Sequence, residues 1–223
     1  MRQEIKPFAS SLSLRPRDGD STLRSAMVGD TEVVATLAGV GMTSAQRATE
    51  RIIDAVAPDH VVVIGIAGGC APGLRIGDLL VPEVVVDARS GAEHRSAPFG
   101  PRPLAGRILS SDDFKTGHDV LAEHRTNGVD AVDMETAAIA SVCEARGVPW
   151  TAFRAMSDLL EEHLLGDFAI DMIGPDGSPK FGPIAKYILL HPWHVPRFAR
   201  LARDTNKATA AASSAAIDAI KVG

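Results

Sequence analysis

The chain has 223 residues, of which 45% are hydrophobic and 23% charged, and its formal net charge at pH 7 is −5. This composition is typical of a globular protein with a sizeable core. The acidic balance argues against nucleic-acid binding, which needs a basic surface, and against attachment to anionic membranes. No apolar run approaches the roughly 20 residues that a membrane span needs.

The opening residues, MRQEIKPFASS, lack the apolar centre of a signal peptide. Two cysteines, Cys70 and Cys143, stand far apart in apolar surroundings, so we expect reduced, buried thiols. Both features indicate a cytoplasmic protein without stable membrane insertion.

In chain order, the first elements predicted are a β-hairpin, a helix and a buried strand. Apolar runs at 22–28 and 32–37 flank Gly29-Asp30, a dipeptide typical of hairpin turns. Residues 43–56 have their apolar side chains on one helical face. Residues 60–66 read HVVVIGI, and this continuous β-branched run predicts a central strand covered on both faces.

Strands and helices alternate through the rest of the chain, without internal repeats or a linker. This alternation predicts one α/β domain over residues 1–223, with a mixed, largely parallel sheet. Strands are predicted at 79–86, 107–111 and 150–156, a loop at 89–103, and helices at 117–125, 134–146, 184–190, 195–203 and 208–220.

Two carboxylates occupy positions typical of a ligand site. Asp158, beside Ser157, directly follows a predicted buried strand, and Glu135 stands at the start of the preceding helix. Ligands bind at the carboxyl ends of strands in open α/β sheets. Purely structural roles are the alternative to ligand binding. Asp158 is equally explained as a helix N-cap, and Glu135 as a first-turn acid favoured by the helix dipole.

The glycine loop around Ala67 and Gly68 follows the predicted central strand. It lacks the spacing of a dinucleotide fingerprint and the lysine of a P-loop. A plain turn between strands is one interpretation. The other is that the absent side chains let the backbone approach a flat ligand closely.

Five motifs occur in one order: GVG at 39–41, IAGGCAPGLRIGDLLVP at 66–82, SSDDF at 110–114, AVDMETAAIA at 131–140 and RAMSD at 154–158. Together they resemble the nucleoside phosphorylase/nucleosidase superfamily, in particular its methylthioadenosine/S-adenosylhomocysteine nucleosidases. The resemblance implies a three-layer αβα sandwich and hydrolysis of the N-glycosidic bond of a 5′-substituted adenine nucleoside. It also implies a small-molecule substrate, no cofactor and a homodimer.

The resemblance also implies roles for single residues. Asp158 would protonate N7 of the purine, with Ser157 orienting it. Glu135 would bind the ribose hydroxyls, with Met134 packed under the sugar and Arg154 setting the position of Glu135.

Four further residues complete the implied substrate site. Phe114 would stack on adenine, and the backbone of Lys115 would read the base edge. Ala67 and Gly68 would bring backbone close to base and sugar. Asp133, in the same acidic motif as Glu135, is counted with the substrate-binding residues. Core packing is the alternative for Phe114.

The chemistry agrees with these roles. Adenine is a poor leaving group as an anion, so N7 must gain a proton as the bond breaks. Burial raises the pKa of an aspartate, which is what an acid working near neutral pH requires. A carboxylate on the hydroxyls favours the positive charge that develops on the sugar.

The sequence departs from the family at its start. Members begin with a strand and a turn whose last residues MRQE resembles, and Glu4 would then be the carboxylate that activates the attacking water. We expect either a native start upstream of Met1 or a mobile, exposed Glu4. The second case would make the chain a catalytically weak adenine-nucleoside-binding protein.

Two other departures bear on the reaction. Ile66 stands where phosphorylases carry Ser or Thr, which favours water over phosphate, with a phosphorylase as the alternative. The segment 86–107 is short and would leave the 5′ end open, and ILLHPWHVPRFARLARD at 188–204 resembles adenosylhopane nucleosidases. His191 and His194 lack partners at metal-ligand spacing, so no metal site is predicted.

Overall fold

A computed structural model describes residues 2–113, 117–160, 190 and 195–222, with the side chains of residues 2–4, 197 and 198 left aside. The chain begins with helix α1 (Arg2–Ser11). A three-stranded antiparallel sheet follows, in the order β1 (Arg15–Arg17), β2 (Asp20–Val28) and β3 (Thr31–Ala35). The predicted hairpin is confirmed, because β2 and β3 pair from Val28 and Thr31 outward. Gly29 adopts a φ of 59°, which suits glycine at the turn.

A second sheet has seven strands in the order β5-β10-β4-β9-β8-β6-β7. Its strands are β4 (Val61–Gly69), β5 (Leu79–Leu80), β6 (Val84–Asp87), β7 (Glu93–Arg95), β8 (Arg107–Ser110), β9 (Ala131–Asp133) and β10 (Trp150–Leu159). Neighbours β10–β4, β6–β8 and β8–β9 run parallel, whereas β5, β7 and the β4–β9 pair are antiparallel. The sheet is therefore mixed.

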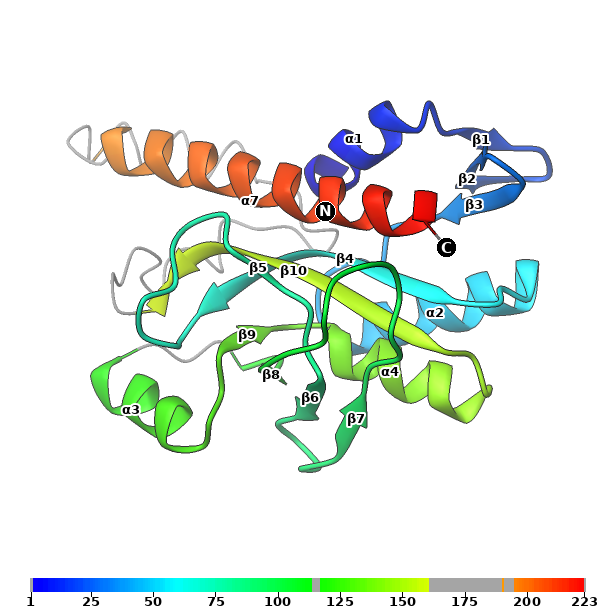
Figure 1. The fold of residues 1–223 in the computed structure, drawn as a ribbon. Helices are drawn as coiled ribbons and strands as arrows, with labels where there is room; N and C mark the ends of the chain where they lie inside the picture. The colour runs from blue at the N-terminus through cyan, green and yellow to red at the C-terminus, as the bar shows by residue number, and fades with distance from the viewer. Residues whose placement is uncertain (1, 114–116, 161–189, 191–194, 223) are drawn as a thin grey trace.

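Helices cover both faces of this sheet, which confirms the three-layer architecture (Figure 1). On one side α2 (Met42–Val56) packs against α4 (Thr136–Ala145). On the other side α7 (Val195–Val222) lies over β4 and β10 and contacts α1. Helix α3 (His118–Thr126) precedes β9. Among the described residues, no helix is long and apolar enough to cross a membrane.

Several predicted boundaries were wrong for local reasons. The single strand at 79–86 is two strands, β5 and β6, which pair with different neighbours because Pro82 cannot continue a ladder. The helices at 195–203 and 208–220 form one helix, since no Pro or Gly interrupts 199–222. The segment 89–103, predicted as a loop, contains β7, whose polar sequence EHR has no strand pattern.

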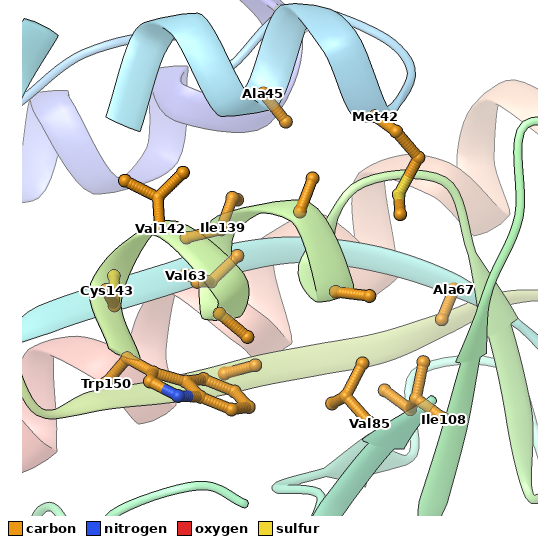
Figure 2. Packing of buried hydrophobic residues seen from close by; sticks show 14 of the residues in the cluster. Met42, Ala45, Val63, Ala67, Val85, Ile108, Ile139, Val142, Cys143 and Trp150 are labelled. Carbon is orange, nitrogen blue, oxygen red and sulfur yellow. The ribbon is translucent and has the colours of Figure 1, made fainter. Parts of the chain in front are cut away.

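The main core lies between the α2–α4 layer and the sheet (Figure 2). Trp150, Ile108 and Val85 are almost fully buried there. Helix α4 contributes small residues such as Ala137 and Ala140, which let it approach the strands closely. A second core around Phe8 and Phe153 fills the other side of the sheet. Together these layers fix the strand ends that carry the candidate site.

Candidate active site

The predicted site residues meet at one cavity of about 1120 Å³. Eight of the eleven line it: Ala67, Gly68, Asp133, Met134, Glu135, Arg154, Ser157 and Asp158. They come from the carboxyl end of β4, from the middle and carboxyl end of β10, from the last residue of β9 and from the turn that leads into α4. The structure thus brings together residues that are up to 91 positions apart in the sequence.

Asp158 is positioned by an irregularity in the pairing of β10 with β4. The register shifts between Met156 and Asp158, so that Asp158 pairs with Gly68, and such a bulge re-aims side chains. Asp158 is 8% exposed, and the Ser157 hydroxyl donates a hydrogen bond to its Oδ1 at 2.6 Å. A methyl group at Gly68 would lie 3.3 Å from Asp158 Oδ2. The absent side chain therefore keeps space beside the carboxylate.

Glu135 is fixed by groups outside its own helix. It is the N-cap residue of α4, yet its side chain makes no capping hydrogen bond there. One carboxylate oxygen lies 3.4 Å from Arg154 Nη2, and the other accepts from the Gly41 N–H at 3.2 Å. These contacts argue against the simple interpretation of Glu135 as an acid placed to complement its helix dipole.

Arg154 is buried in a polar cluster behind Glu135. Its Nε lies 2.9 Å from Asp133 Oδ2, and its Nη1 donates to the Ile66 carbonyl at 3.4 Å. The Thr136 hydroxyl accepts from Arg154 Nε at 3.0 Å and from Nη2 at 2.8 Å. Since a buried charge is costly unless paired and hydrogen-bonded, this saturation holds the guanidinium in place.

Asp133, the last residue of β9, forms an ion pair with Arg154. Its side chain is only 1% exposed, and it accepts from the Ser110 hydroxyl at 2.5 Å and from the Thr136 hydroxyl. This geometry favours a role in positioning Arg154 over the direct substrate contact expected from the sequence.

The amino end of α2 also meets the site. The Met42 N–H donates to Asp112 Oδ1 at 2.7 Å, and the preceding Gly41 N–H donates to Glu135. The first N–H groups of a helix have no partner within the helix and attract anions. In this protein, two such N–H groups are bound by the protein's own carboxylates.

Three predicted residues are not placed by the structure. Phe114 and Lys115 lie outside the described residues, as do His191 and His194, and Glu4 lies in α1 with its side chain outside the description. Within the described ranges, no group of three His, Cys, Asp or Glu side chains is arranged to hold a metal.

Sequence reasoning missed four residues that support the site: Ser110, Asp112, Thr136 and Gly65. A methyl group at Gly65 would lie 2.2 Å from Arg154 Nη1, so this glycine makes room for the guanidinium. Ser110 and Asp112 stand in the SSDDF motif, and Thr136 follows Glu135. Their positions within these motifs were the only indication in the sequence that they support the site. Their roles could not be predicted, because the groups that they contact lie in other elements.

Comparisons with known proteins identify the family to which the chain belongs. A family model described as the phosphorylase superfamily matches residues 1–104 and 87–172. The chain belongs to the phosphorylase superfamily. The 5′-methylthioadenosine/S-adenosylhomocysteine nucleosidase of Actinobacillus succinogenes is 30% identical to this superfamily member over 189 residues, which cover 71% of this chain and 82% of that protein. The corresponding nucleosidase of Glaesserella parasuis is 30% identical over 171 residues, covering 63% and 74%.

Solved structures share the fold. A mutant of the Helicobacter pylori nucleosidase with 5′-methylthioadenosine in its active site matches with a TM-score of 0.72 and 17% identity, covering 99% of this chain and 94% of that one. The Neisseria meningitidis nucleosidase in complex with methylthio-immucillin-A matches with a TM-score of 0.72 and 21% identity, covering 99% of this chain and 95% of that one. Futalosine hydrolase of Helicobacter pylori matches with a TM-score of 0.70 and 17% identity, covering 99% of this chain and 94% of that one.

Proposed function

We propose that this superfamily member hydrolyses the N-glycosidic bond of an adenine nucleoside with a 5′-substituted ribose and releases adenine. The observation that carries the proposal is that Asp158 and Glu135 line one cavity and each carboxylate has dedicated partners. The nucleosidase relatives, named for 5′-methylthioadenosine and S-adenosylhomocysteine, support the same reaction class.

In the proposed reaction, Asp158 transfers a proton to N7 of the base as the bond between C1′ and N9 breaks. Ser157 orients the carboxyl group through its hydrogen bond. Glu135 accepts hydrogen bonds from the ribose hydroxyls, and its negative charge favours the oxocarbenium-like sugar. Water adds to C1′ and loses a proton to a carboxylate base.

Glu4 is the base that we propose for the water. The neighbouring Ile5 and Phe8 of α1 line the same cavity as Asp158, which supports this assignment. Phe114 and Lys115, adjacent to the described SSDD residues, are proposed to bind adenine by stacking and through the backbone. Stacking of this kind contributes roughly 1–3 kcal/mol.

Water is favoured over phosphate as the nucleophile by the charges around the cavity. Phosphate binding needs donors and positive charge. Ile66 supplies no side-chain donor, and the amino end of α2 is engaged by Asp112 and Glu135. Arg154 is engaged by Asp133 and Glu135. To bind here, a phosphate would have to displace these carboxylates from the N–H groups and the guanidinium that they already occupy.

The decisive experiment measures adenine release from 5′-methylthioadenosine, S-adenosylhomocysteine and an adenosylhopane-type lipid in phosphate-free buffer. We expect release to proceed without phosphate and to yield the free sugar. A requirement for phosphate, with ribose 1-phosphate as product, would establish a phosphorylase instead. Binding of adenosine without adenine release over hours would establish the third alternative, a nucleoside-binding protein.

The 5′ substituent and the assembly are finer parts of the proposal. The nucleosidase relatives favour a methylthio or homocysteinyl group, whereas the 188–204 sequence favours a hopane chain. Efficient turnover of 5′-methylthioadenosine would exclude the lipid as the preferred substrate. We also propose a cytoplasmic homodimer, which light scattering on the purified protein and cell fractionation would test.

A further inference from the structure

The amino end of α4 is capped by residues that lie outside the helix. The first N–H groups of a helix have no partner within it and need other acceptors. Here the Ala137 N–H donates to the Ser110 hydroxyl at 3.0 Å. The N–H groups of Glu135 and Thr136 donate to Asp133 Oδ1 at 3.4 Å and 3.3 Å. The acceptors therefore come from the last residues of β8 and β9.

This external cap leaves the side chain of Glu135 available to the cavity. Polar residues at the N-cap position of a helix commonly bind the N–H groups of the first turn with their own side chain. Glu135 occupies that position in α4 but makes no such hydrogen bond. Its carboxylate instead contacts Arg154 and the Gly41 N–H, and it lines the cavity. Capping by Ser110 and Asp133 therefore allows the Glu135 carboxylate to face the ligand site rather than its own helix.

Ser110 is the fully buried member of this cap, with an exposed fraction of 0%. Its hydroxyl donates to Asp133 Oδ1 at 2.5 Å and accepts from the Ala137 N–H, so the single donor and one acceptor position are both used. Parallel pairing of β8 with β9 places Ser110 opposite Asp133. The backbone is fixed as well, since the Ser110 carbonyl accepts from the Ala88 N–H at 3.0 Å. One buried hydroxyl thus joins the end of β9 to the start of α4.

The neighbouring Ser111 shows that this arrangement belongs to one serine of the SSDDF motif. The Ser111 hydroxyl donates to the Asp113 carbonyl at 3.2 Å and accepts from the Asp113 N–H at 3.1 Å. It therefore stabilises its own turn, whereas the Ser110 hydroxyl bonds to β9 and α4. The two adjacent serines form a natural pair for comparison.

We propose that Ser110 is a positioning residue for ribose recognition, which acts on Glu135 through the α4 cap that it shares with Asp133. This inference rests on the proposed nucleosidase function. Without the hydroxyl, the buried Ala137 N–H would lose its acceptor, which is costly. The Glu135 carboxylate stands at the N-cap position, where the positive end of the helix dipole attracts it. It would turn towards the first turn of α4 and withdraw from the ribose hydroxyls.

The test is a double-mutant cycle between Ser110→Ala and Glu135→Gln in the full chain. The measured quantity is kcat/KM for adenine release from 5′-methylthioadenosine, for the native chain, both single variants and the double variant. We expect Ser110→Ala to lower kcat/KM at least about tenfold in the native background. In the Glu135→Gln background it should lower kcat/KM less than about twofold, because the carboxylate through which it acts is absent.

Adenine supplies a second readout, because it lacks the ribose that Glu135 is proposed to bind. Calorimetry should give an adenine affinity for Ser110→Ala within about twofold of the native value, while KM for the nucleoside rises. Ser111→Ala is the matched control, and any loss that it causes should persist in the Glu135→Gln background. If Ser110→Ala does not fold, Ser110→Cys takes its place, since a thiol is close in size but bonds weakly.

The outcomes separate this inference from the proposed function. Unchanged kcat/KM in Ser110→Ala, additive losses in the cycle, or equal losses for adenine and nucleoside would overturn the positioning role and leave the nucleosidase reaction standing. If the native chain binds 5′-methylthioadenosine without releasing adenine, the cycle is measured on its dissociation constant. Coupling of the two substitutions would then support positioning although the reaction had failed. A native chain that binds no adenine nucleoside would overturn both.

Discussion

Arg154 links Asp133 to Glu135, with Nε at 2.9 Å from the first carboxylate and Nη2 at 3.4 Å from the second. The three side chains come from β10, from the end of β9 and from the start of α4. All three line the cavity, but the side chains of Arg154 and Asp133 are 5% and 1% exposed, whereas that of Glu135 is 17% exposed. The buried Asp133–Arg154 pair thus sets the position of Glu135, the carboxylate that we propose binds the ribose.

Replacing Asp133 by Asn should therefore weaken both the fold and ribose binding. Removing one partner of a buried ion pair costs about 3–5 kcal/mol when the remaining charge has no other partner, and Glu135 and Thr136 moderate that loss here. We expect lower stability in urea unfolding and a higher KM for the nucleoside. Asp112→Asn is a control, since Asp112 does not contact Arg154 and caps α2. A destabilised Asp133→Asn variant with unchanged KM would contradict a positioning role.

Asp158→Asn should abolish most of the catalysis while leaving nucleoside binding intact. The amide has the size of the carboxyl group but cannot deliver a proton, and positioned proton donors contribute about 10²–10⁴-fold to rate. Chromatography of the released adenine measures the catalytic rate, and calorimetry with the substrate measures binding.

Ser157→Ala is the matched comparison for Asp158. It removes the 2.6 Å hydrogen bond to the carboxyl group but retains the acid. A hydrogen bond to a charged group contributes about 1.5–3 kcal/mol, so a loss of roughly ten- to a hundredfold in kcat is expected. An Asp158→Asn enzyme more active than Ser157→Ala would refute the assignment of Asp158 as the acid.

Gly65→Ala should impair the site through Arg154. The added methyl group would lie 2.2 Å from Arg154 Nη1, far inside van der Waals contact, and overpacking of this kind costs about 1–3 kcal/mol. We expect reduced stability and a raised KM, measured by thermal unfolding and initial rates. Gly73→Ala is the control, because its methyl group meets no atom within 4 Å and only the backbone at φ +82° is strained. It should lower stability without changing KM.

These residues show what the sequence could and could not predict. Asp158, Glu135 and Arg154 stand inside contiguous motifs, and strand-end geometry explains why they meet. The contact of Gly65 with Arg154 joins neighbouring strands, and no local pattern encodes it. The HVVVIGI run predicts a covered strand, but it does not indicate which strands lie beside it. Both the Gly65–Arg154 contact and the neighbours of β4 depend on which distant segments pair in the sheet, so local sequence patterns could not predict them.

The two cysteines predict a loss of stability at alkaline pH. Burial raises the pKa of the Cys70 thiol from 9.0 to about 12, with Asp158 and Asp130 adding to the effect and Arg125 opposing it. Burial likewise raises the pKa of Cys143 to about 12. The unfolded thiols ionise first, so above pH 9 the unfolded state binds fewer protons and stability falls as pH rises.

Each thiol lowers the free energy of unfolding by about 1.4 kcal/mol per pH unit above its ordinary pKa of 9.0. Between pH 8 and 10 the two thiols together should therefore lower it by about 3 kcal/mol. Urea unfolding at the two pH values measures the change. The Cys70→Ala/Cys143→Ala double variant is the control, because lysine and tyrosine titration remains in it. Its stability should fall by about 3 kcal/mol less than that of the native protein over the same interval. Equal losses in both proteins would mean that the thiols are not buried in their neutral form.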